Sequence, residues 1–322
     1  MKKYLITGAN GFVASHFLDL LELSINNVEI AALDIADEFV HSVNNNQNLN
    51  LKYYQMNLLD SDKIEKLLID FQPDYVLHLA SYSSVAYSWE QPVKSFVNNT
   101  NIFLNLVDAI QKHDLKSRLL SVGSSEEYGN VKPEDIPLSE SNSLNPISPY
   151  AVARVSQEML SKVYSHSMNL DVVITRSFNH IGPRQRSSFV VPSFIKRAVD
   201  AKLAGQNEMI LTTGDTTIIR DFLDVRDVVR AYYLLFEKGE KGEVYNICSG
   251  NAVALSQIIE VIEDKLKIKI NTTTDHYLLR PNDNKIIVGD NTKLKASTGW
   301  YQTYSLEQSI EDIIEYFLKY EK

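Results

Sequence analysis

The stretch "TGANGFVASHF", residues 7–17, decides the fold of this 322-residue chain. Gly8, Gly11 and Ala14 stand three residues apart, directly after a short apolar run and at the start of an amphipathic stretch. Small residues at this spacing let a strand turn sharply into a helix, and the first N–H groups of that helix can then bind a phosphate. The stretch therefore predicts a strand, a phosphate-binding loop and a helix, the beginning of a dinucleotide-binding fold.

Short apolar runs alternate with amphipathic stretches over the first half of the chain. We expect strands at 3–8, 28–34, 51–57, 75–81, 117–124 and 170–177. We expect helices between them at 11–23, 61–70, 92–112 and 149–168. Consecutive apolar residues within these strands are typical of a parallel sheet that is covered on both faces. The alternation predicts an α/β fold, a doubly wound parallel sheet of the Rossmann type.

The pattern becomes irregular after residue 178. We expect helices at 190–204, 225–238, 255–267 and 305–320, and strands at 208–212 and 243–247. Such a mixture is typical of a smaller α+β domain. The sequence therefore predicts a first domain over 1–177, to which 216–247 returns in part, and a second, substrate-binding domain over 178–322.

The composition excludes several classes of protein. The formal charge of −9 is opposite in sign to that of a general nucleic-acid or membrane-surface binder. A single cysteine, Cys248, cannot form a disulfide within the chain, which favours a reducing compartment. The N-terminal apolar run is too short for a signal peptide, and no stretch reaches the ~18 apolar residues of a membrane span. We expect a cytoplasmic protein without a metal, nucleic-acid or membrane partner.

Asp34 ends the second expected strand, in "ALDIAD". A carboxylate at this position can accept hydrogen bonds from the hydroxyls of an adenosine ribose and repels a 2′-phosphate. No arginine follows it directly. The sequence therefore predicts NAD(H) as the preferred cofactor, with NADP(H) as the alternative, although a solvated aspartate at a strand end would give the same pattern.

Tyr150 and Arg154, in "SPYAVARVSQEML" (148–160), lie four residues apart at the start of an expected helix. Side chains at this spacing share one face of a helix. A phenol has an ordinary pKa of about 10 and needs a neighbouring cation to exchange a proton near neutral pH. The pair is thus a candidate acid/base site, and the alternative is a plain amphipathic helix that begins at Pro149.

The order of these motifs resembles one family closely. The phosphate loop, "HLAS" (78–81), "SVGSSEEYG" (121–129) and the Tyr150 helix resemble the extended short-chain dehydrogenases/reductases that act on nucleotide sugars. The stretches 177–198, 214–235 and 280–300 are most similar to the GDP-4-keto-6-deoxy-D-mannose reductases and GDP-mannose 4,6-dehydratases. The resemblance covers nearly the whole chain.

The resemblance implies roles for individual residues. Tyr150 is expected to exchange a proton with the sugar oxygen and Ser124 to bind that oxygen, while Ser125 and Glu126 stand where the dehydratases carry out their C5–C6 chemistry. Arg154 stands where the family has lysine, which puts its contact with the nicotinamide ribose in doubt.

Asn57 replaces a more usual aspartate beside the adenine. Asn99 is expected to be structural, although Ile102 stands where a glycine is usual in that helix. The cofactor set is Gly8, Asn10, Gly11, Phe12, Val13, Asp34, Asn57, Leu58, Leu79, Ala80, Tyr150 and Arg154.

The same resemblance implies a binding site for a GDP-sugar. Its residues are Asn179, Phe189, Val190, Lys196, Arg220, Arg280 and Asp283. Guanidinium groups suit a diphosphate and a carboxylate suits ribose hydroxyls or a guanine edge. A salt bridge from Arg220 to Asp221 or Asp224 is the structural alternative. The resemblance also implies a homodimer that associates through helices 92–112 and 149–168, and a shaping rather than catalytic role for His180.

Several activities fit these residues. The first expectation is a 4-reductase acting on a GDP-4-keto-6-deoxy-mannose or a related hexose or heptose. The alternatives are a GDP-sugar 4,6-dehydratase or a 4-dehydrogenase with tightly held NAD(H), because Glu126 occurs in a string that reductases and dehydratases share. A non-catalytic dinucleotide-binding protein is a further alternative, and it rests on Arg154.

Overall fold

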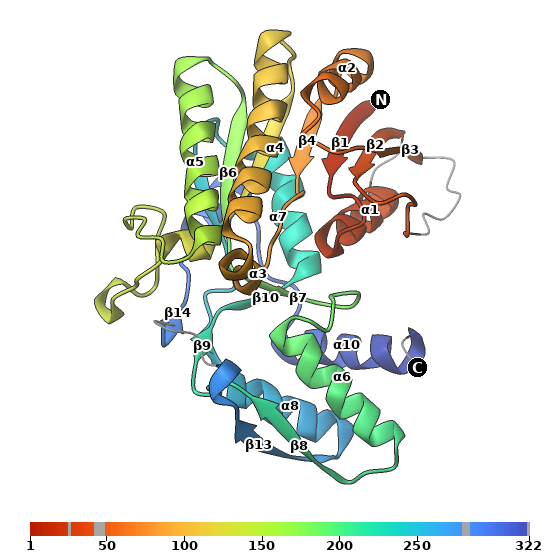
Figure 1. Ribbon diagram of the computed structural model, residues 1–322, viewed down its shortest axis with the longest axis vertical. Helices are drawn as coiled ribbons and strands as arrows, with labels where there is room; N and C mark the ends of the chain where they lie inside the picture. The colour runs from red at the N-terminus through yellow and green to blue at the C-terminus, as the bar shows by residue number, and fades with distance from the viewer. Residues whose placement is uncertain (25–26, 42–48, 279–283, 321–322) are drawn as a thin grey trace.

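A seven-stranded parallel sheet lies at the centre of the computed structural model, which describes residues 1–24, 27–41, 49–278 and 284–320 (Figure 1). The order of the strands is β11-β6-β5-β4-β1-β2-β3. Their bounds are β1 (Lys2–Thr7), β2 (Val28–Asp34), β3 (Leu49–Gln55), β4 (Tyr75–His78), β5 (Arg118–Ser124), β6 (Val172–Ser177) and β11 (Val244–Ile247). Every neighbouring pair is parallel. The doubly wound Rossmann sheet expected from the sequence is confirmed.

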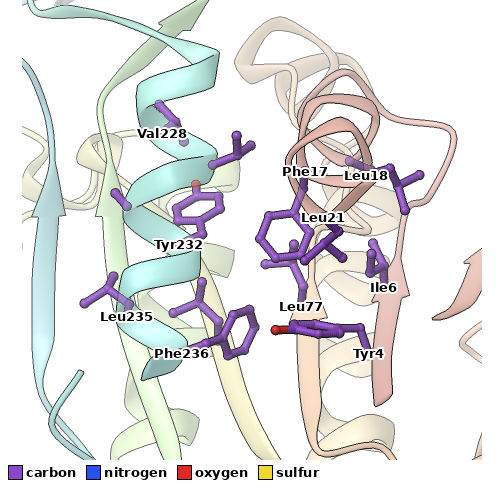
Figure 2. Close-up of a cluster of buried hydrophobic side chains, with 14 of the residues drawn as sticks. Tyr4, Ile6, Phe17, Leu18, Leu21, Leu77, Val228, Tyr232, Leu235 and Phe236 are labelled. Carbon is purple, nitrogen blue, oxygen red and sulfur yellow. The ribbon is translucent and has the colours of Figure 1, made fainter. Parts of the chain in front are cut away.

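Helices cover both faces of the sheet. α1 (Phe12–Ser24) and α7 (Val225–Lys238) lie on one face, where Tyr4 and Ile6 of β1 join their apolar side chains (Figure 2). α2 (Ser61–Phe71), α4 (Pro92–Lys112) and α5 (Pro149–Ser167) lie on the other, where Leu5 points. Because successive side chains of a strand alternate between faces, the continuous apolar run of β1 supplies both cores.

The remaining elements form a second, smaller body below the sheet in Figure 1. α6 (Val190–Leu203), α8 (Leu255–Leu266) and α10 (Leu306–Tyr320) share one apolar core with β8 (Glu208–Thr213) and β13 (Lys269–Thr274), a parallel pair. The structure also contains short elements that the sequence did not predict. They are α3 (Val85–Glu90), α9 (Thr292–Thr298), β7 (Asn179–Ile181), β9 (Ile219–Arg220), β10 (Phe222–Asp224), β12 (Val253–Ala254) and β14 (Ile286–Ile287), with three 3-10 helices.

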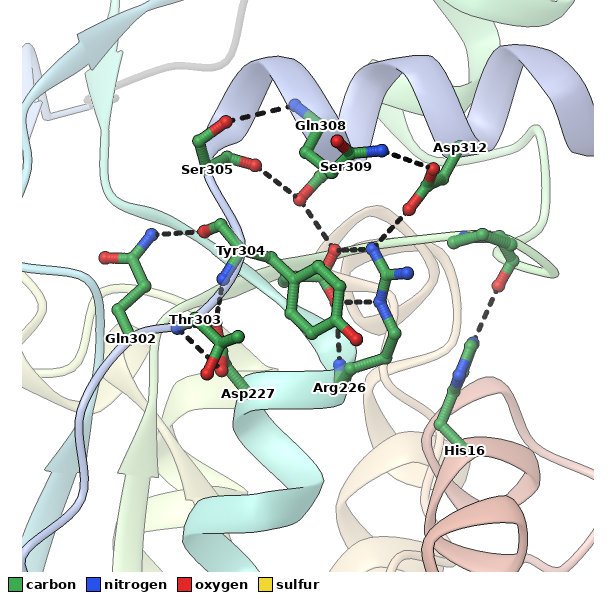
Figure 3. Close-up of polar contacts among 12 residues, drawn as sticks. His16, Arg226, Asp227, Gln302, Thr303, Tyr304, Ser305, Gln308, Ser309 and Asp312 are labelled. Atoms are coloured by element: carbon green, nitrogen blue, oxygen red, sulfur yellow. Dashed lines mark hydrogen bonds and ion pairs between the residues drawn. The ribbon is translucent and has the colours of Figure 1, made fainter. Parts of the chain in front are cut away.

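Polar contacts fix the last helix against the start of α7 (Figure 3). Arg226 forms ion pairs with Asp224 and with Asp312 of α10, at 2.7 and 2.6 Å, and its guanidinium lies 3.6 Å from the ring centroid of Tyr304. The buried carboxylate of Asp227 accepts the backbone N–H groups of Thr303 and Tyr304. These contacts join the second body to a helix that packs on the Rossmann sheet. In the described part of the chain, no helix is long and apolar enough to cross a membrane.

Candidate active site

A cavity of about 760 Å³ opens at the carboxyl ends of the central strands, between the sheet and the second body. In a doubly wound sheet this edge is where the loops diverge and a ligand can enter. Every residue of the expected cofactor set lines the cavity. The lining also includes Ser124, Asn179, Phe189 and Val190. The fold therefore gathers into one space residues that are spread over most of the chain.

The phosphate loop lies at one end of this cavity. Gly8 has a φ of +69°, and a Cβ on it would lie 2.9 Å from the backbone nitrogen of Ala80. Only glycine suits both the conformation and this close approach. Phe12 begins α1, so the unpaired N–H groups of the first turn are directed to the cavity side. The loop and helix end thus fit the diphosphate of a dinucleotide, which needs backbone donors without side-chain bulk.

Asp34 stands at the end of β2, beside this loop. Its Oδ2 accepts the N–H of Asn10 at 2.9 Å, and its Oδ1 accepts the N–H of Ala36 at 3.2 Å. The side chain of Asn10 in turn binds the backbone of Glu38 and Val40. The carboxylate is therefore held at the cavity wall by a closed turn, which fixes a negative charge where an adenosine ribose is expected. Asn57, at the end of the next strand, accepts the N–H of Leu59 at 3.0 Å.

The end of β4 is tied to β1 by Thr7. Its hydroxyl oxygen accepts the N–H groups of Leu79 and Ala80, both at 3.1 Å, and lies 3.0 Å from Nδ1 of the buried His78. Burial and the charge of Arg154 lower the pKa of His78 to about 3. A neutral imidazole accepts the proton of Thr7, so the turn at Leu79 and Ala80 has one fixed geometry.

Asn99 and Ile102 of α4 complete this part of the wall. The buried Asn99 binds both the N–H and the C=O of Tyr82, at 2.8 and 3.0 Å. It therefore holds the chain that leaves β4 and runs along the cavity. Ile102 is buried and lines the cavity, so its side chain fills space that a glycine would leave open.

Tyr150 and Arg154 are brought together as the sequence predicted. The Ser148 hydroxyl accepts the N–H of Ala151 at 3.1 Å and Pro149 occupies the first turn, so α5 begins with both side chains directed inward. Nε of Arg154 donates to the Tyr150 hydroxyl at 3.2 Å. Both side chains are buried yet reach the cavity. The phenol therefore has a permanent cation as its hydrogen-bond partner.

The guanidinium of Arg154 is held on several sides. Its NH1 donates to the carbonyl of Val122 at 3.1 Å and to Oε1 of Gln157 at 2.7 Å, and its NH2 donates to the Ser81 hydroxyl at 2.5 Å. With the bond to Tyr150, four of the five guanidinium N–H donors have partners among the described residues. The fifth is left for a group in the cavity. The acceptors around position 154 therefore match the several donors of a planar guanidinium.

Ser124 ends β5 and lines the cavity near Tyr150. Its hydroxyl accepts the N–H of Glu126 at 3.2 Å. Ser125 is buried and Glu126 half-buried in the 3-10 helix η1 (Ser125–Tyr128), and neither is among the described residues that line the cavity. The three residues that the sequence grouped together therefore differ in their access to a ligand.

The expected substrate residues are brought together less completely. Asn179, Phe189 and Val190 line the cavity, whereas the described lining does not include Lys196 or Arg220. Lys196 pairs with Asp200 of its own helix at 2.6 Å, and Arg220 donates to the carbonyls of Ile219 and Asn284 at 2.9 and 2.8 Å. Arg280 and Asp283 lie outside the described residues.

Sequence reasoning missed several side chains at the floor of the cavity. Tyr232 of α7 reaches it from the opposite face of the sheet, and its hydroxyl lies 2.8 Å from the Ser177 hydroxyl and 3.5 Å from Nε2 of His180. Burial lowers the pKa of His180 to about 4, so this imidazole is neutral. The shaping role expected for His180 stays a prediction. Tyr232 gave no sequence signal because its spacing on α7 is that of an ordinary core residue.

Arg184 links the second body to α1 at the cavity rim. Its guanidinium forms an ion pair with Asp19 and lies 3.1 Å from Nδ1 of His16. Nε2 of His16 lies 2.9 Å from the carbonyl of Pro183, a contact visible in Figure 3. Burial and the charge of Arg184 lower the pKa of His16 to about 4, so the imidazole is neutral at physiological pH.

The Rossmann sheet with its phosphate loop, and the Tyr150 helix beside Ser124, define a class of protein. The chain is an NAD(P)-dependent enzyme of the extended short-chain dehydrogenase/reductase type. More particularly, it belongs to the GDP-mannose 4,6 dehydratase family, whose pattern its sequence matches over residues 5–313.

Individual relatives are similar along their full length. The chain is 29% identical to GDP-6-deoxy-D-mannose reductase from Pseudomonas aeruginosa over 313 residues, 97% of this chain and 96% of that protein. The structure of RMD from Pseudomonas aeruginosa complexed with NADPH is 28% identical, with a TM-score of 0.83 over 98% and 97% of the two chains. A UDP-glucose 4-epimerase from Thermotoga maritima, solved with UDP-glucose, is 29% identical, with a TM-score of 0.87 over 99% and 100%.

Proposed function

We propose that this protein is a GDP-4-keto-6-deoxy-mannose 4-reductase, or reduces the C4 ketone of a closely related GDP-hexose or GDP-heptose. The observation that carries the proposal is the composition of the cavity wall. Tyr150 and Ser124, the two hydroxyls that a ketone reduction needs, line the cavity, whereas Glu126, the base that a dehydratase needs at C5, is not among its described lining residues. The end-to-end similarity to a GDP-6-deoxy-D-mannose reductase supports the same activity.

The residues perform the reduction as follows. The Ser124 hydroxyl donates a hydrogen bond to the C4 carbonyl oxygen and holds the ketone beside Tyr150. The reduced nicotinamide, when bound, supplies the hydride that C4 receives. Tyr150 donates its proton to the carbonyl oxygen as negative charge develops there, and Arg154 stabilises the phenolate that is left. The remaining N–H of Arg154 is available for a ribose hydroxyl, in place of the usual lysine.

Asp34 is the basis for proposing NAD(H) as the preferred cofactor. Among the described residues no cation pairs with its carboxylate, which is fixed by two backbone N–H groups. A 2′-phosphate placed beside it would meet an uncompensated negative charge. NADP(H), which was bound in the relative from Pseudomonas aeruginosa, remains the alternative cofactor.

The sugar nucleotide is assigned to the side of the cavity formed by the second body. Asn179, Phe189 and Val190 line it, and Lys196 and Arg220 stand on elements next to it. Residues 1–177, with 216–247 in part, would then hold the dinucleotide, and 178–322 the GDP-sugar. Arg220 is proposed to bind the diphosphate, since a guanidinium forms strong charge-assisted hydrogen bonds with phosphate oxygens.

A homodimer is proposed from the exposed faces of α4 and α5. Val93, Phe96, Trp89 and Val152 line an open apolar groove there, and Val93 is 73% exposed. Exposed apolar groups gathered in this way are typical of an interface, and a two-fold axis would pair each groove with its copy. Val93→Glu should halve the mass measured by sedimentation equilibrium, whereas Lys94→Glu at the next, polar position should not.

Two alternatives predict different stoichiometry. A 4,6-dehydratase would convert GDP-mannose with loss of water and no net change in NADH, and a 4-dehydrogenase would purify with NADH bound. Incubation with GDP-mannose and, separately, with its 4-keto-6-deoxy derivative distinguishes them when the products are read by mass and NADH by absorbance. We expect only the ketosugar to consume NADH. A binding protein without activity would change neither sugar.

A further inference from the structure

A pair of buried carboxyl groups lies directly behind Ser124. Glu127 belongs to η1 and Glu158 to α5, and both side chains are almost fully buried. Buried carboxyl groups are costly unless each has a cation, a donor or a proton of its own. The contacts of the two groups differ, and the difference assigns a role to Glu127.

Glu158 forms ion pairs with two cations. Arg176 of β6 donates to both of its oxygens, at 2.8 and 2.9 Å, and Lys162 of α5 approaches Oε1 to 2.7 Å. Burial alone would raise the pKa of Glu158, but the hydrogen bonds and charges of Arg176 and Lys162 lower it to about 2. Glu158 is therefore a carboxylate at every working pH, and it neutralises the buried guanidinium.

Among the described residues, Glu127 has one hydrogen-bond donor and no ion-pair partner. Its Oε1 accepts the backbone N–H of Ser124 at 2.7 Å. Its Oε2 is buried and receives no hydrogen bond from the described residues, and the side chains of Glu127 and Glu158 interact directly. Two carboxylates cannot bind one another without a proton. A proton on Oε2 resolves the arrangement, since Glu127 can then donate to Glu158.

The surrounding charges agree with a proton on Glu127. Burial and the charge of Glu158 raise the pKa of Glu127 well above its ordinary value, against the smaller opposing effects of the Ser124 N–H and Arg176. The cations of this cluster are Arg176, which also lies 4.8 Å from the ring of Tyr128 and donates to the backbone carbonyl of Glu140, and Lys162. Both cations form their ion pairs with Glu158, and among the described residues neither forms one with Glu127.

Gly123 makes room for this acid. A Cβ on Gly123 would lie 2.3 Å from Oε1 of Glu127 and 2.5 Å from the carbonyl of Thr175. Any larger residue would push the carboxyl group away from the Ser124 N–H. The string "GSSEE" (123–127) therefore specifies a cradle for Glu127 as well as the serine that faces the cavity.

We propose that Glu127 is a positioning residue, held as a neutral acid between the Ser124 N–H and Glu158, which fixes the Ser124 hydroxyl beside Tyr150. The inference rests on the role of Ser124 in the proposed reduction. Loss of the proton would set two carboxylates against each other and release the end of β5. The position of the Ser124 hydroxyl therefore depends on the pH, through the proton on Glu127.

Glu127→Gln is the deciding variant, because glutamine keeps an acceptor for Ser124 and a donor for Glu158 but has no proton to lose. A pKa raised in the folded state means that stability is fully present at acid pH and is lost as the pH rises. The melting temperature of Glu127→Gln minus that of wild type should therefore grow by a few degrees when the pH is raised from about 5.5 to about 9. Glu134→Gln, which removes an exposed carboxylate nearby, should show no such trend.

Turnover gives a second reading that general destabilisation would not produce. Glu127→Gln should keep kcat within about threefold of wild type and extend activity to higher pH, while Glu127→Leu should lower kcat at least about tenfold with KM nearly constant. A pH-independent gap in melting temperature for Glu127→Gln would overturn the neutral acid. Unchanged kcat in Glu127→Leu would overturn the positioning role. If that variant does not fold, the pH range of activity of Glu127→Gln decides, and a range that reaches no higher than that of wild type would overturn the role.

The melting-temperature measurements require no substrate. If wild type reduces no GDP-ketosugar, the proposed function fails while the pH trend of Glu127→Gln still tests the proton. If wild type is active and the trend is absent, only the inference on Glu127 fails.

Discussion

The two sides of the cavity are built in different ways. The side proposed to bind the dinucleotide is built at the ends of adjacent strands: Gly8 directly after β1, Asp34 at the end of β2 and Ala80 after β4. The sugar side consists of long side chains on short elements such as β7, β9 and the start of α6. Hydrogen bonds of Asp34 and Thr7 already hold the first side in place. The second has its cations engaged elsewhere, Lys196 with Asp200 and Arg220 with two carbonyls. A fixed backbone site suits a cofactor that many enzymes share. Cations that can change partner allow different members of a family to bind different substrates.

The largest expected effect lies where the two sides meet, at Tyr150. Tyr150→Phe removes only the hydroxyl that exchanges the proton, so turnover should fall at least about a hundredfold. Affinity for NAD(H) and for GDP, measured by calorimetry, should stay nearly unchanged. Tyr164→Phe removes a hydroxyl from the far end of the same helix, where it lies 3.4 Å from Asp108, and should be active. Full activity in Tyr150→Phe would remove the catalytic assignment.

Arg154→Lys tests whether the dinucleotide side is as rigid as we describe. A lysine ammonium has three donors on a shorter reach and cannot serve Tyr150, Val122, Gln157 and Ser81 together. We expect kcat to fall about tenfold or more and NAD binding to weaken, because a buried acceptor that loses its donor costs about 1–3 kcal/mol. Arg118→Lys, at an arginine that binds Asp171 and backbone carbonyls away from the cavity, should lower stability alone. A faster Arg154→Lys enzyme would contradict this account.

Arg220→Ala tests the movable cations of the sugar side. Losing one charge-assisted contact to a diphosphate costs about 1.5–3 kcal/mol, so KM for the GDP-sugar should rise about tenfold with kcat little changed. Arg197→Ala, which removes a nearby arginine that donates to the carbonyl of Thr212, serves as the control. Wild-type affinity for GDP in Arg220→Ala would mean that Arg220 does not bind the sugar nucleotide.

The smallest effect concerns the choice between cofactors. Repulsion by the carboxylate of Asp34 should make NADH bind several-fold more tightly than NADPH, and Asp34→Asn should bring the two affinities closer together. Asp37→Asn, which removes a neighbouring carboxylate that binds Gln55, should leave the ratio unchanged. A clear preference of the wild type for NADPH in calorimetric titrations would show that Asp34 does not govern the choice.

The same contrast explains what the sequence could predict. The strands and long helices of the first half follow from apolar runs and from the spacing of Gly8, Gly11 and Ala14, because local pattern and final burial agree there. The pair of Tyr150 and Arg154 follows from helix geometry alone. The short strands β7, β9 and β10 have two or three residues each, too few for a periodic pattern.

Side-chain partners were harder to predict than elements. The hold on Arg154 involves Ser81 and Val122, which are distant in sequence and meet only through the order of β4 and β5 in the sheet. Tyr232 reaches the cavity from α7 across the sheet. Glu127 lies in a string in which the family resemblance assigns a role only to Glu126. In each case the information lies in tertiary contacts that no local pattern encodes.

The central claim, reduction of a GDP-ketosugar by external hydride, is tested most directly by isotope transfer. NADH deuterated at the transferable position of the nicotinamide would be supplied with GDP-4-keto-6-deoxy-mannose, and the sugar product analysed by mass spectrometry and proton NMR. The account predicts a product that carries one deuterium, bound at C4, with one NADH consumed for each sugar reduced. An unlabelled, unchanged ketosugar, together with loss of water from GDP-mannose at constant NADH, would contradict it.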